Sequence, residues 1–218
     1  MPNFIKRRIA GAEIIFLPEK CLWYPAQAAL CLADLHIGKS THFQRFGQYL
    51  PQTVKPDLYR LERLLKERNI KTCFFLGDLF HSTLNDEWKM LDQFFSHHQQ
   101  VTFHLILGNH DILPRYIYEQ SLLKVSPDSF FLAPLRLIHQ LPDLIGNEFV
   151  VAGHIHPAVQ LYDHSGAQTQ FPCFYLAQNY LILPAFGSAT GTSILQVKKG
   201  DEVFVTNGEE IAEVSQSL

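Results

Sequence analysis

The chain has 218 residues, of which 47% are hydrophobic and 18% are charged, and its formal net charge is −3. This composition is typical of a globular protein and excludes an intrinsically disordered one. The length is sufficient for one substantial core, so we expect a single domain over residues 1–218. A slightly acidic chain has no overall basic field that would predict nucleic-acid binding, although bound metal ions would add positive charge locally.

The N-terminal sequence and the cysteines indicate the cellular compartment in which the protein is expected. The charges of residues 6–8 are not followed by an apolar run, so a secretory signal peptide is not expected. No apolar stretch of the sequence is long enough to span a bilayer, and we expect no membrane partner. The four cysteines form no CxxC pair and are typical of reduced, buried thiols. We therefore predict a cytoplasmic protein.

The first half of the chain alternates between predicted strands and predicted helices. Leucines at helical spacing predict a helix over residues 51–68, and we expect its charged face to be solvent exposed. Asn85 is a suitable N-cap for a second helix, which would bury Trp88 and Leu91 on one side. Short apolar runs predict strands over residues 13–17, 21–24, 28–33, 72–76 and 101–107.

The second half of the chain is mostly predicted β structure. A short helix is expected over residues 114–120, and the polar last dozen residues are expected to fray. Strand–helix alternation that gives way to strands fits two packed sheets with helices outside them. The strands predicted in this half cover residues 122–125, 130–132, 135–138, 148–152, 158–162, 170–176, 180–183, 194–197 and 203–205.

Side chains of metal-ligating types follow five of the predicted strands at the point where each strand ends. Ligands bind at the carboxyl ends of the strands in α/β sheets. Residues two apart on an extended backbone face the same way, so Asp34 and His36 can aim at one point. We interpret Gly108 as the residue that permits a tight turn. The five clusters are Asp34-Leu-His36, Gly77-Asp78, Gly108-Asn109-His110-Asp111, His139 and Gly153-His154-Ile-His156.

These donor types predict the metal. Each cluster alone is ambiguous, since a turn with an unrelated histidine explains it too, but the five together predict one site. Carboxylate and amide oxygens mixed with imidazoles suit Mn²⁺, Fe²⁺ or Zn²⁺ better than Ca²⁺ or Mg²⁺. There are more candidate ligands than one ion needs, so we predict two divalent ions, with Mn²⁺ favoured. Two ions about 3.5–4 Å apart form a clamp for phosphoryl transfer.

The ordered series of motifs from Asp34 to His156 resembles the calcineurin-like metallophosphoesterase superfamily. Four longer stretches are similar to bacterial phosphoesterases associated with ATP-dependent DNA ligase repair clusters, whose members are described as DNA-damage-response endonucleases. These stretches are Asp34-Leu-His-Ile-Gly-Lys39, Gly77-Asp-Leu-Phe-His81, Gly153-His-Ile-His-Pro157 and Leu183-Pro-Ala-Phe-Gly187. The resemblance implies a four-layer αββα sandwich of two mixed β-sheets flanked by helices. It also implies DNA as the substrate, and functional association with an ATP-dependent DNA ligase and a helicase-like nuclease.

The resemblance implies a division of the ligands between two metals. Three residues would hold one ion, three would hold the other, and one carboxylate would bridge both. The first set is Asp34, His36 and His156, the second is Asn109, His139 and His154, and the bridge is Asp78. His139 stands between Ile138 and Gln140, whereas many relatives have a Gly or another His beside it, so its assignment rests mainly on its position at a strand end.

The implied reaction is phosphodiester hydrolysis by a hydroxide that bridges the two metals and attacks phosphorus in line. His110 is the candidate general acid for the leaving alkoxide, and Asp111 would orient its imidazole or raise its pKa. Lys39, His42 and Arg45 are candidate phosphate contacts, although a solvated loop explains these residues equally well.

Several interpretations stay open from the sequence. His81 follows the bridging carboxylate and is either a metal-supporting or substrate-contacting group, or a local cap. A small-molecule phosphodiesterase or phosphatase acting on nucleotides would use the same ligands, and no stripe of aromatic and basic residues typical of single-strand binding is apparent. An inactive scaffold on this fold would usually lack the acid or a ligand, whereas both are present. Residues 183–187 have no physical explanation from the sequence.

Overall fold

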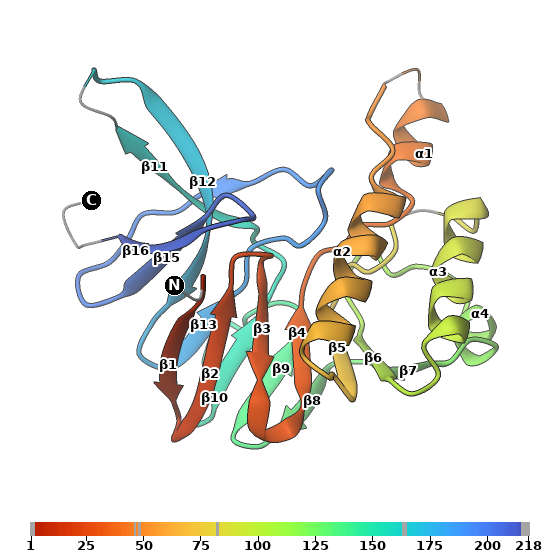
Figure 1. The fold of residues 1–218 in the computed structure, drawn as a ribbon, viewed down its shortest axis with the longest axis horizontal. Coiled ribbons are helices and arrows are strands. Elements are labelled where there is room, and N and C mark those ends of the chain that lie inside the picture. Colours follow the sequence, from red (N-terminus) through yellow and green to blue (C-terminus); the bar gives the residue numbers. More distant parts are fainter. Residues whose placement is uncertain (1–2, 46, 48, 82, 163–164, 215–218) are drawn as a thin grey trace.

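Two β-sheets and a small set of helices make up the described part of the chain (Figure 1). The structure is a computed structural model, and it describes all residues except 1–2, 46, 48, 82, 163–164 and 215–218, and the side chain of Arg45. No helix in these described ranges is long and apolar enough to cross a membrane. The helices are the 3₁₀ helix η1 (Pro25–Gln27) and the α-helices α1 (Lys39–Arg45), α2 (Val54–Glu67), α3 (Asp86–His97) and α4 (Arg115–Glu119).

The first sheet follows the chain order from β1 to β7. Neighbouring strands are antiparallel up to β4 and parallel from β4 to β7, because α-helical crossovers join the later strands. The carboxyl ends of β4, β5 and β6 therefore meet at one edge of the sheet. The strands are β1 (Ile5–Ile9), β2 (Ala12–Leu17), β3 (Cys21–Tyr24), β4 (Ala29–Leu32), β5 (Thr72–Leu76), β6 (Thr102–Ile106) and β7 (Leu123–Ser126).

The second sheet has the strand order β14-β11-β12-β13-β10-β9-β8, and β12 also pairs with β15, which pairs with β16. It is mixed: β10 is parallel to both β9 and β13, whereas β12 is antiparallel to its neighbours. The strands are β8 (Ser129–Leu132), β9 (Leu135–Ile138), β10 (Phe149–Ala152), β11 (Pro157–Tyr162), β12 (Gln168–Leu176), β13 (Tyr180–Ile182), β14 (Ser193–Ile194), β15 (Glu202–Thr206) and β16 (Ile211–Val214).

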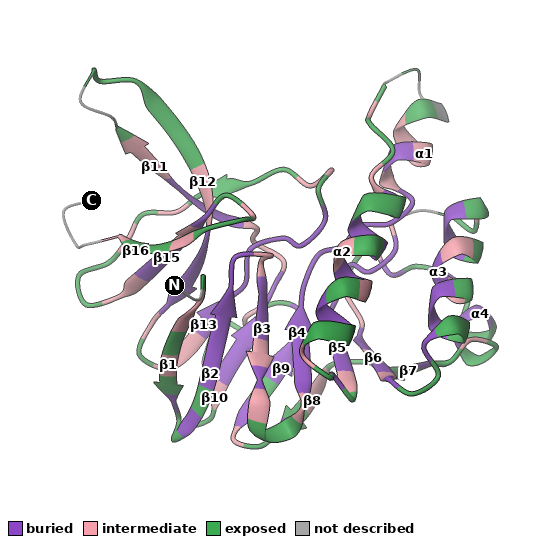
Figure 2. Ribbon diagram, viewed as in Figure 1, coloured by how far each residue is buried: buried purple, intermediate pink, exposed green. Residues whose placement is uncertain are grey.

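Two hydrophobic layers hold these parts together (Figure 2). Alternate residues of β4 face opposite ways: Leu30 and Leu32 pack with α2 and α3, and Cys31 packs between the sheets. This double burial explains why β4 is entirely apolar and why the buried residues of β5 and β6 are apolar on both faces. The core between the sheets contains Phe16, Phe174 and other fully buried side chains. In the described part, the outer face of the second sheet is covered by irregular segments that are not helical.

Three local expectations were wrong. β1 was not predicted because its sequence is charged, yet Arg7 pairs with Glu202 and Glu213 of the last two strands. β16 forms in the segment expected to fray, because it pairs with β15. The charged face of α2 is not entirely solvated, since Asp57 is only 2% exposed. Arg7 and Asp57 are bonded to partners distant in the sequence, whereas β16 forms a hairpin with the neighbouring strand β15.

Phe174→Ala should lower the free energy of unfolding by about 3–5 kcal/mol, because the ring is fully buried between the sheets and its removal leaves a cavity. Urea unfolding followed by circular dichroism would measure this. Phe131→Ala is the matched control, since Phe131 is 59% exposed and its loss should change stability by about 0.5 kcal/mol or less. Equal losses in the two variants would contradict this description of the core.

Candidate metal centre

The candidate site lies where the carboxyl ends of β4, β5 and β6 meet those of β9 and β10. The two sheets approach closely at this edge, where Ala33 and Ala185 form an isolated parallel bridge. The backbone amide of His154, after β10, donates a hydrogen bond of 2.9 Å to Oδ2 of Asp34, after β4. Residues that follow five different strands are thus brought to one place.

The first group of predicted ligands is compact. Oδ1 of Asp34 is 3.4 Å from Nε2 of His156, and Nε2 of His36 is also 3.4 Å from Nε2 of His156. One ligand atom from each of the three residues lies within 4.8 Å of the others, a spacing that a single ion can bridge. Asp34 is fully buried, His36 is buried and His156 is partly exposed.

A second group lies beside the first. Nδ1 of His154 and Oδ1 of Asn109 are 3.0 Å and 3.1 Å from Nε2 of His139. Oδ1 of Asp78 is 3.5 Å from the same nitrogen, and Oδ2 of Asp78 is 3.7 Å from Nε2 of His36 in the first group. Each carboxylate oxygen of Asp78 therefore faces a different group, which is the arrangement that a bridging ligand requires.

The donors in both groups fit divalent metal ions. Among the described residues, Oδ1 of Asp34 has no hydrogen-bond partner although it is buried, and a buried lone acceptor of this kind is costly unless a cation satisfies it. Burial, and then the neighbouring His156, lowers the pKa of His36 to about 2, so its imidazole is neutral. A neutral imidazole offers the nitrogen lone pair that a metal needs.

The ligand loops have an unusual backbone. Asp34 and His36 have φ angles of 56° and 49°, in the left-handed region, so they meet at one site although the backbone is not extended there. Asp78, His154 and His156 share this conformation. These five account for most of the nine described non-glycine residues with positive φ, so the strained backbone is concentrated at this site. Asp and His tolerate the left-handed region better than most residues do.

The glycines in the motifs allow the ligands to approach the backbone. A Cβ at Gly108 would lie 2.3 Å from Oδ1 of Asp78, and a Cβ at Gly153 would lie 2.7 Å from Oδ2 of Asp34. Gly108 begins the turn expected from the sequence, since the amide of Asp111 donates to its carbonyl over 3.2 Å, but its φ is not positive, so the close approach is what requires a glycine there. Gly77 combines both requirements, with a φ of 77° and with Nδ1 of His139 2.1 Å from its hypothetical Cβ.

Comparison with known proteins identifies the family. Residues 29–171 match the model of the family described as calcineurin-like phosphoesterase, which is more than half of the chain and includes both groups of ligands. The chain belongs to the calcineurin-like phosphoesterase family. It is therefore a metal-dependent phosphoesterase, which confirms the predicted superfamily and enzyme class.

A solved nuclease structure shows the same fold. The chain is similar to the nuclease MPE of Pseudomonas putida, with a TM-score of 0.80 and 27% sequence identity over 97% of this chain and 100% of that chain. The phosphoesterase YfcE of E. coli matches with a TM-score of 0.46 and 16% identity, over 85% of this chain and 97% of that chain. No match was found among curated proteins. The predicted metallophosphoesterase sandwich is confirmed.

The loop Gly108–Asp111 of this phosphoesterase carries His110 and Asp111, the two residues predicted to be catalytic. The backbone amide of His110 donates to Oδ1 of Asp78, and its ring stacks on that of His81 with the centroids 4.1 Å apart. Asp111 was expected to orient the His110 imidazole, but its two oxygens accept hydrogen bonds from the amides of Phe80 and Gly108. Burial raises the pKa of Asp111 to about 7, although these hydrogen bonds oppose the shift. Asp111 thus fixes the backbone of the loop.

The candidate phosphate contacts lie on α1 or next to the ligands. His81 connects to the first group, since its Nδ1 is 3.1 Å from Nδ1 of His36, and burial lowers its pKa to about 4. The ring of His42 meets that of His81 edge-on at 5.7 Å. Lys39 is half-buried, and burial lowers its pKa. The side chain of Arg45 lies outside the described residues.

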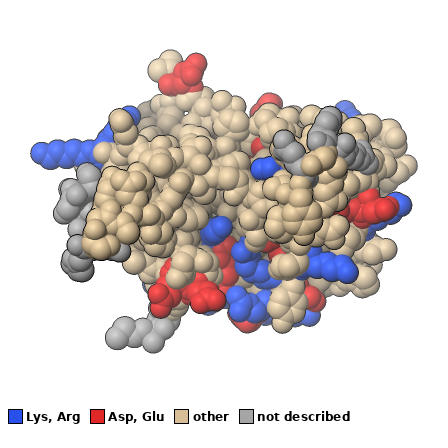
Figure 3. All heavy atoms as spheres, turned by 90° about the horizontal axis from the view of Figure 1, so that it is seen from above, with Lys and Arg blue, Asp and Glu red and all other residues tan. Residues whose placement is uncertain are grey.

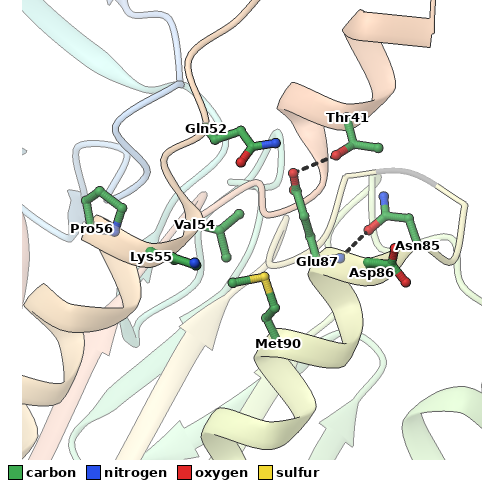
Figure 4. A pocket seen from close by; sticks show the side chains of 9 residues that line it. All are labelled: Thr41, Gln52, Val54, Lys55, Pro56, Asn85, Asp86, Glu87 and Met90. Atoms are coloured by element: carbon green, nitrogen blue, oxygen red, sulfur yellow. Dashed lines mark hydrogen bonds between the residues drawn. The ribbon is translucent and has the colours of Figure 1, made fainter.

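One cavity among the described residues of this phosphoesterase is lined by none of the predicted metal ligands (Figure 4). It measures about 680 Å³ and lies between α1 and the first turns of α2 and α3. Glu87 crosses it to accept a hydrogen bond from Thr41, and Lys55 is the one basic residue in the described lining. Because the cavity contains acidic groups and a single cation, it does not have the character of a phosphate site. The two ligand groups remain the candidate centre.

The surface charge agrees with the composition. Figure 3 shows the end of the molecule where β4 leads into α1, and Lys and Arg form no continuous band among the described residues there. Most of the visible surface is uncharged, and basic and acidic residues mix along one edge. Any attraction of a phosphodiester to this face therefore depends on the local site, because a diffuse basic surface is not visible.

Gly108→Ala should weaken Mn²⁺ binding about 10-fold or more, because the new methyl group would displace the Asp78 carboxylate. Isothermal titration calorimetry would measure the affinity. Gly146→Ala is the matched control, since no atom lies within 4 Å of its Cβ position and its φ is not in the left-handed region. Unchanged binding in Gly108→Ala would mean that Asp78 does not hold a metal in this arrangement.

Proposed function

We propose that this phosphoesterase is a di-metal phosphodiesterase that cleaves DNA and acts in DNA repair. The observation that carries the proposal is the position of Asp78, whose two oxygens face two separate groups of ligand-type side chains. The nuclease character of the similar Pseudomonas putida protein supports a nucleic acid as the substrate, and the sequence resemblance to DNA-damage-response endonucleases favours DNA. Mn²⁺ is the metal that we favour, with Fe²⁺ or Zn²⁺ as alternatives.

We assign the ligands as the sequence predicted. Asp34, His36 and His156 would hold one ion, and Asn109, His139 and His154 would hold the other, with Asp78 shared. When bound, two such ions lower the pKa of a water molecule enough to make it a nucleophile, and stabilise charge on the phosphoryl oxygens. The burial of the carboxylates supports this assignment, because a dry site strengthens every electrostatic interaction within it.

His110 is the residue that we assign to the leaving group. Its backbone amide is bonded to Asp78, so the loop places it next to the ligands, and its ring centroid is 5.4 Å from that of His36. The side chain is partly exposed, which leaves it accessible to substrate. It would donate a proton to the departing alkoxide. Asp111 acts indirectly, because its hydrogen bonds fix the loop that carries His110.

Phosphate binding would use the groups around α1. Lys39 and His42 lie on that helix, which begins directly after the first ligand loop, and His81 lies between His42 and His36. Arg45 stays a candidate from the sequence alone. The cytoplasmic location rests on the N-terminal sequence and the cysteines, and the functional association with an ATP-dependent DNA ligase and a helicase-like nuclease rests on the sequence resemblance.

Nicking of supercoiled plasmid by the Mn²⁺-loaded protein is the experiment that tests the substrate, run beside cyclic and linear nucleotides. We expect nicking that is abolished by chelation and reduced to background in Asp78→Asn, because the bridging carboxylate would be lost. Asp128→Asn removes an exposed carboxylate and should keep full activity. Turnover of nucleotides alone would favour the small-molecule alternative, and unchanged activity in Asp78→Asn would overturn the di-metal mechanism.

His110→Ala should reduce DNA cleavage by about 10²–10⁴-fold, the usual contribution of a positioned general acid. It should reduce hydrolysis of an aryl phosphodiester with an acidic phenol much less, since that leaving group departs without a proton. Initial rates on both substrates would show the difference. His97→Ala, which removes an exposed histidine of α3, should leave both rates unchanged. Equal losses on both substrates in His110→Ala would rule out a role as the acid.

A further inference from the structure

We propose that Asp57 is a positioning residue for the metal ligand Asp34, acting through the segment Phe186–Ser188. This inference rests on the proposed ligand role of Asp34. It concerns a residue of α2 that is not part of either ligand group and that lies on the helix face expected to be solvated. It also gives a role to the Leu183–Gly187 stretch, for which the sequence offered no physical explanation.

Asp57 is buried, and both of its carboxylate oxygens accept hydrogen bonds from Ser188. The amide of Ser188 donates to Oδ2 of Asp57 over 3.0 Å, and the Ser188 hydroxyl donates to Oδ1 over 2.6 Å. Arg60, one turn further along α2, donates to Oδ1 over 3.1 Å. A carboxylate that is 2% exposed is costly to bury, and these charge-assisted hydrogen bonds offset that cost.

Arg60 contacts the same segment. Its guanidinium donates to the carbonyl oxygen of Phe186 and lies over the Phe186 ring, with Cζ 4.0 Å from the centroid. The Phe186 ring is fully buried among the residues that pack α2 and α3 on the first sheet. The Asp57–Arg60 pair therefore fixes both the backbone and the side chain of the segment to α2.

The other side of this segment holds the first ligand loop. The amide of Phe186 donates to the carbonyl of Ala33 over 2.9 Å, and the amide of Gly187 donates to the carbonyl of Asp34 over 3.2 Å. A Cβ at Gly187 would lie 2.3 Å from the carbonyl oxygen of Leu35, so the two backbones are in close contact. Asp34 has positive φ and needs such external bonds to keep its conformation.

The backbone just before this segment reaches the second sheet. The amide of Leu183, three residues before Phe186, donates to the carbonyl of Ala152 at the end of β10, directly before the loop that carries His154 and His156. One continuous stretch of backbone thus contacts the loops that supply all three ligands of the first metal. Loosening the attachment of this stretch to α2 would change the distance between Asp34 and His156. The affinity of these residues for the metal ion would then fall.

Mn²⁺ binding to the full chain, measured by calorimetry without substrate, tests this. Asp57→Asn should weaken one of two sites by about 10–100-fold, the usual effect of changing a group that orients a ligand, and leave the other unchanged. Ser188→Ala should have a smaller effect in the same direction, because its backbone hydrogen bond to Asp57 remains. Glu67→Gln removes the same charge from an exposed position of α2 and should bind as the wild type does.

A destabilised variant separates positioning from general loss of stability. Phe174→Ala should lower stability at a core position that belongs to neither ligand group, so under folding conditions it should keep wild-type Mn²⁺ affinity. Wild-type affinity at both sites in Asp57→Asn would overturn the inference, and so would a Phe174→Ala variant that loses one site equally. A wild type that binds two ions but cleaves no diester would count against the proposed function alone. A wild type that binds no Mn²⁺ would overturn both.

Discussion

The hydrogen bond from the amide of His154 to Oδ2 of Asp34 joins the two sheets at the edge where their strands end. The other features of the site depend on this contact. It requires Gly153, because a Cβ there would lie 2.7 Å from the same oxygen. It also occupies one oxygen of Asp34 and leaves Oδ1 without a hydrogen-bond partner among the described residues. Packing of the two sheets thus leaves Asp34 with one carboxylate oxygen that accepts a backbone hydrogen bond and one that is available for a metal.

The close approach of the two sheets at this edge destabilises the folded chain when no metal is bound. Asp34 and Asp78 are almost completely buried, and their hydrogen bonds come largely from backbone amides at the ends of other strands. Five ligand-type residues have left-handed backbone, at a cost on the order of 1–3 kcal/mol each. Ions that bind only the folded chain would compensate for this strain, because ligand binding and folding are thermodynamically linked. The fold is stable at its cores and strained at its strand ends.

The sequence indicated the parts of the site that depend on local pattern. Apolar runs that stop at Asp, Asn or His mark strand ends, and these ends are brought together because the strands are parallel. Local pattern could not give the backbone conformation at Asp34 or the role of Gly108, since both depend on atoms from another strand. It could not identify Asp57 either, because on a charged helix face nothing distinguishes this aspartate from its neighbours. Its partner Ser188 is 131 residues away.

The loop Gly108–Asp111 shows how adjacent residues can take separate roles. Its backbone is bonded to two carboxylates from different directions: the amide of His110 to Asp78, and the amide of Gly108 to Asp111. Because backbone groups make these bonds, the side chains of Asn109 and His110 are not needed to hold the loop. Asp111 fixes this loop in place, since its other oxygen accepts a hydrogen bond from the amide of Phe80, two residues after Asp78. The fixed loop places the Asn109 side chain against His139 and the His110 ring against His81, and this is the preorganisation that hydrolysis at a metal centre requires.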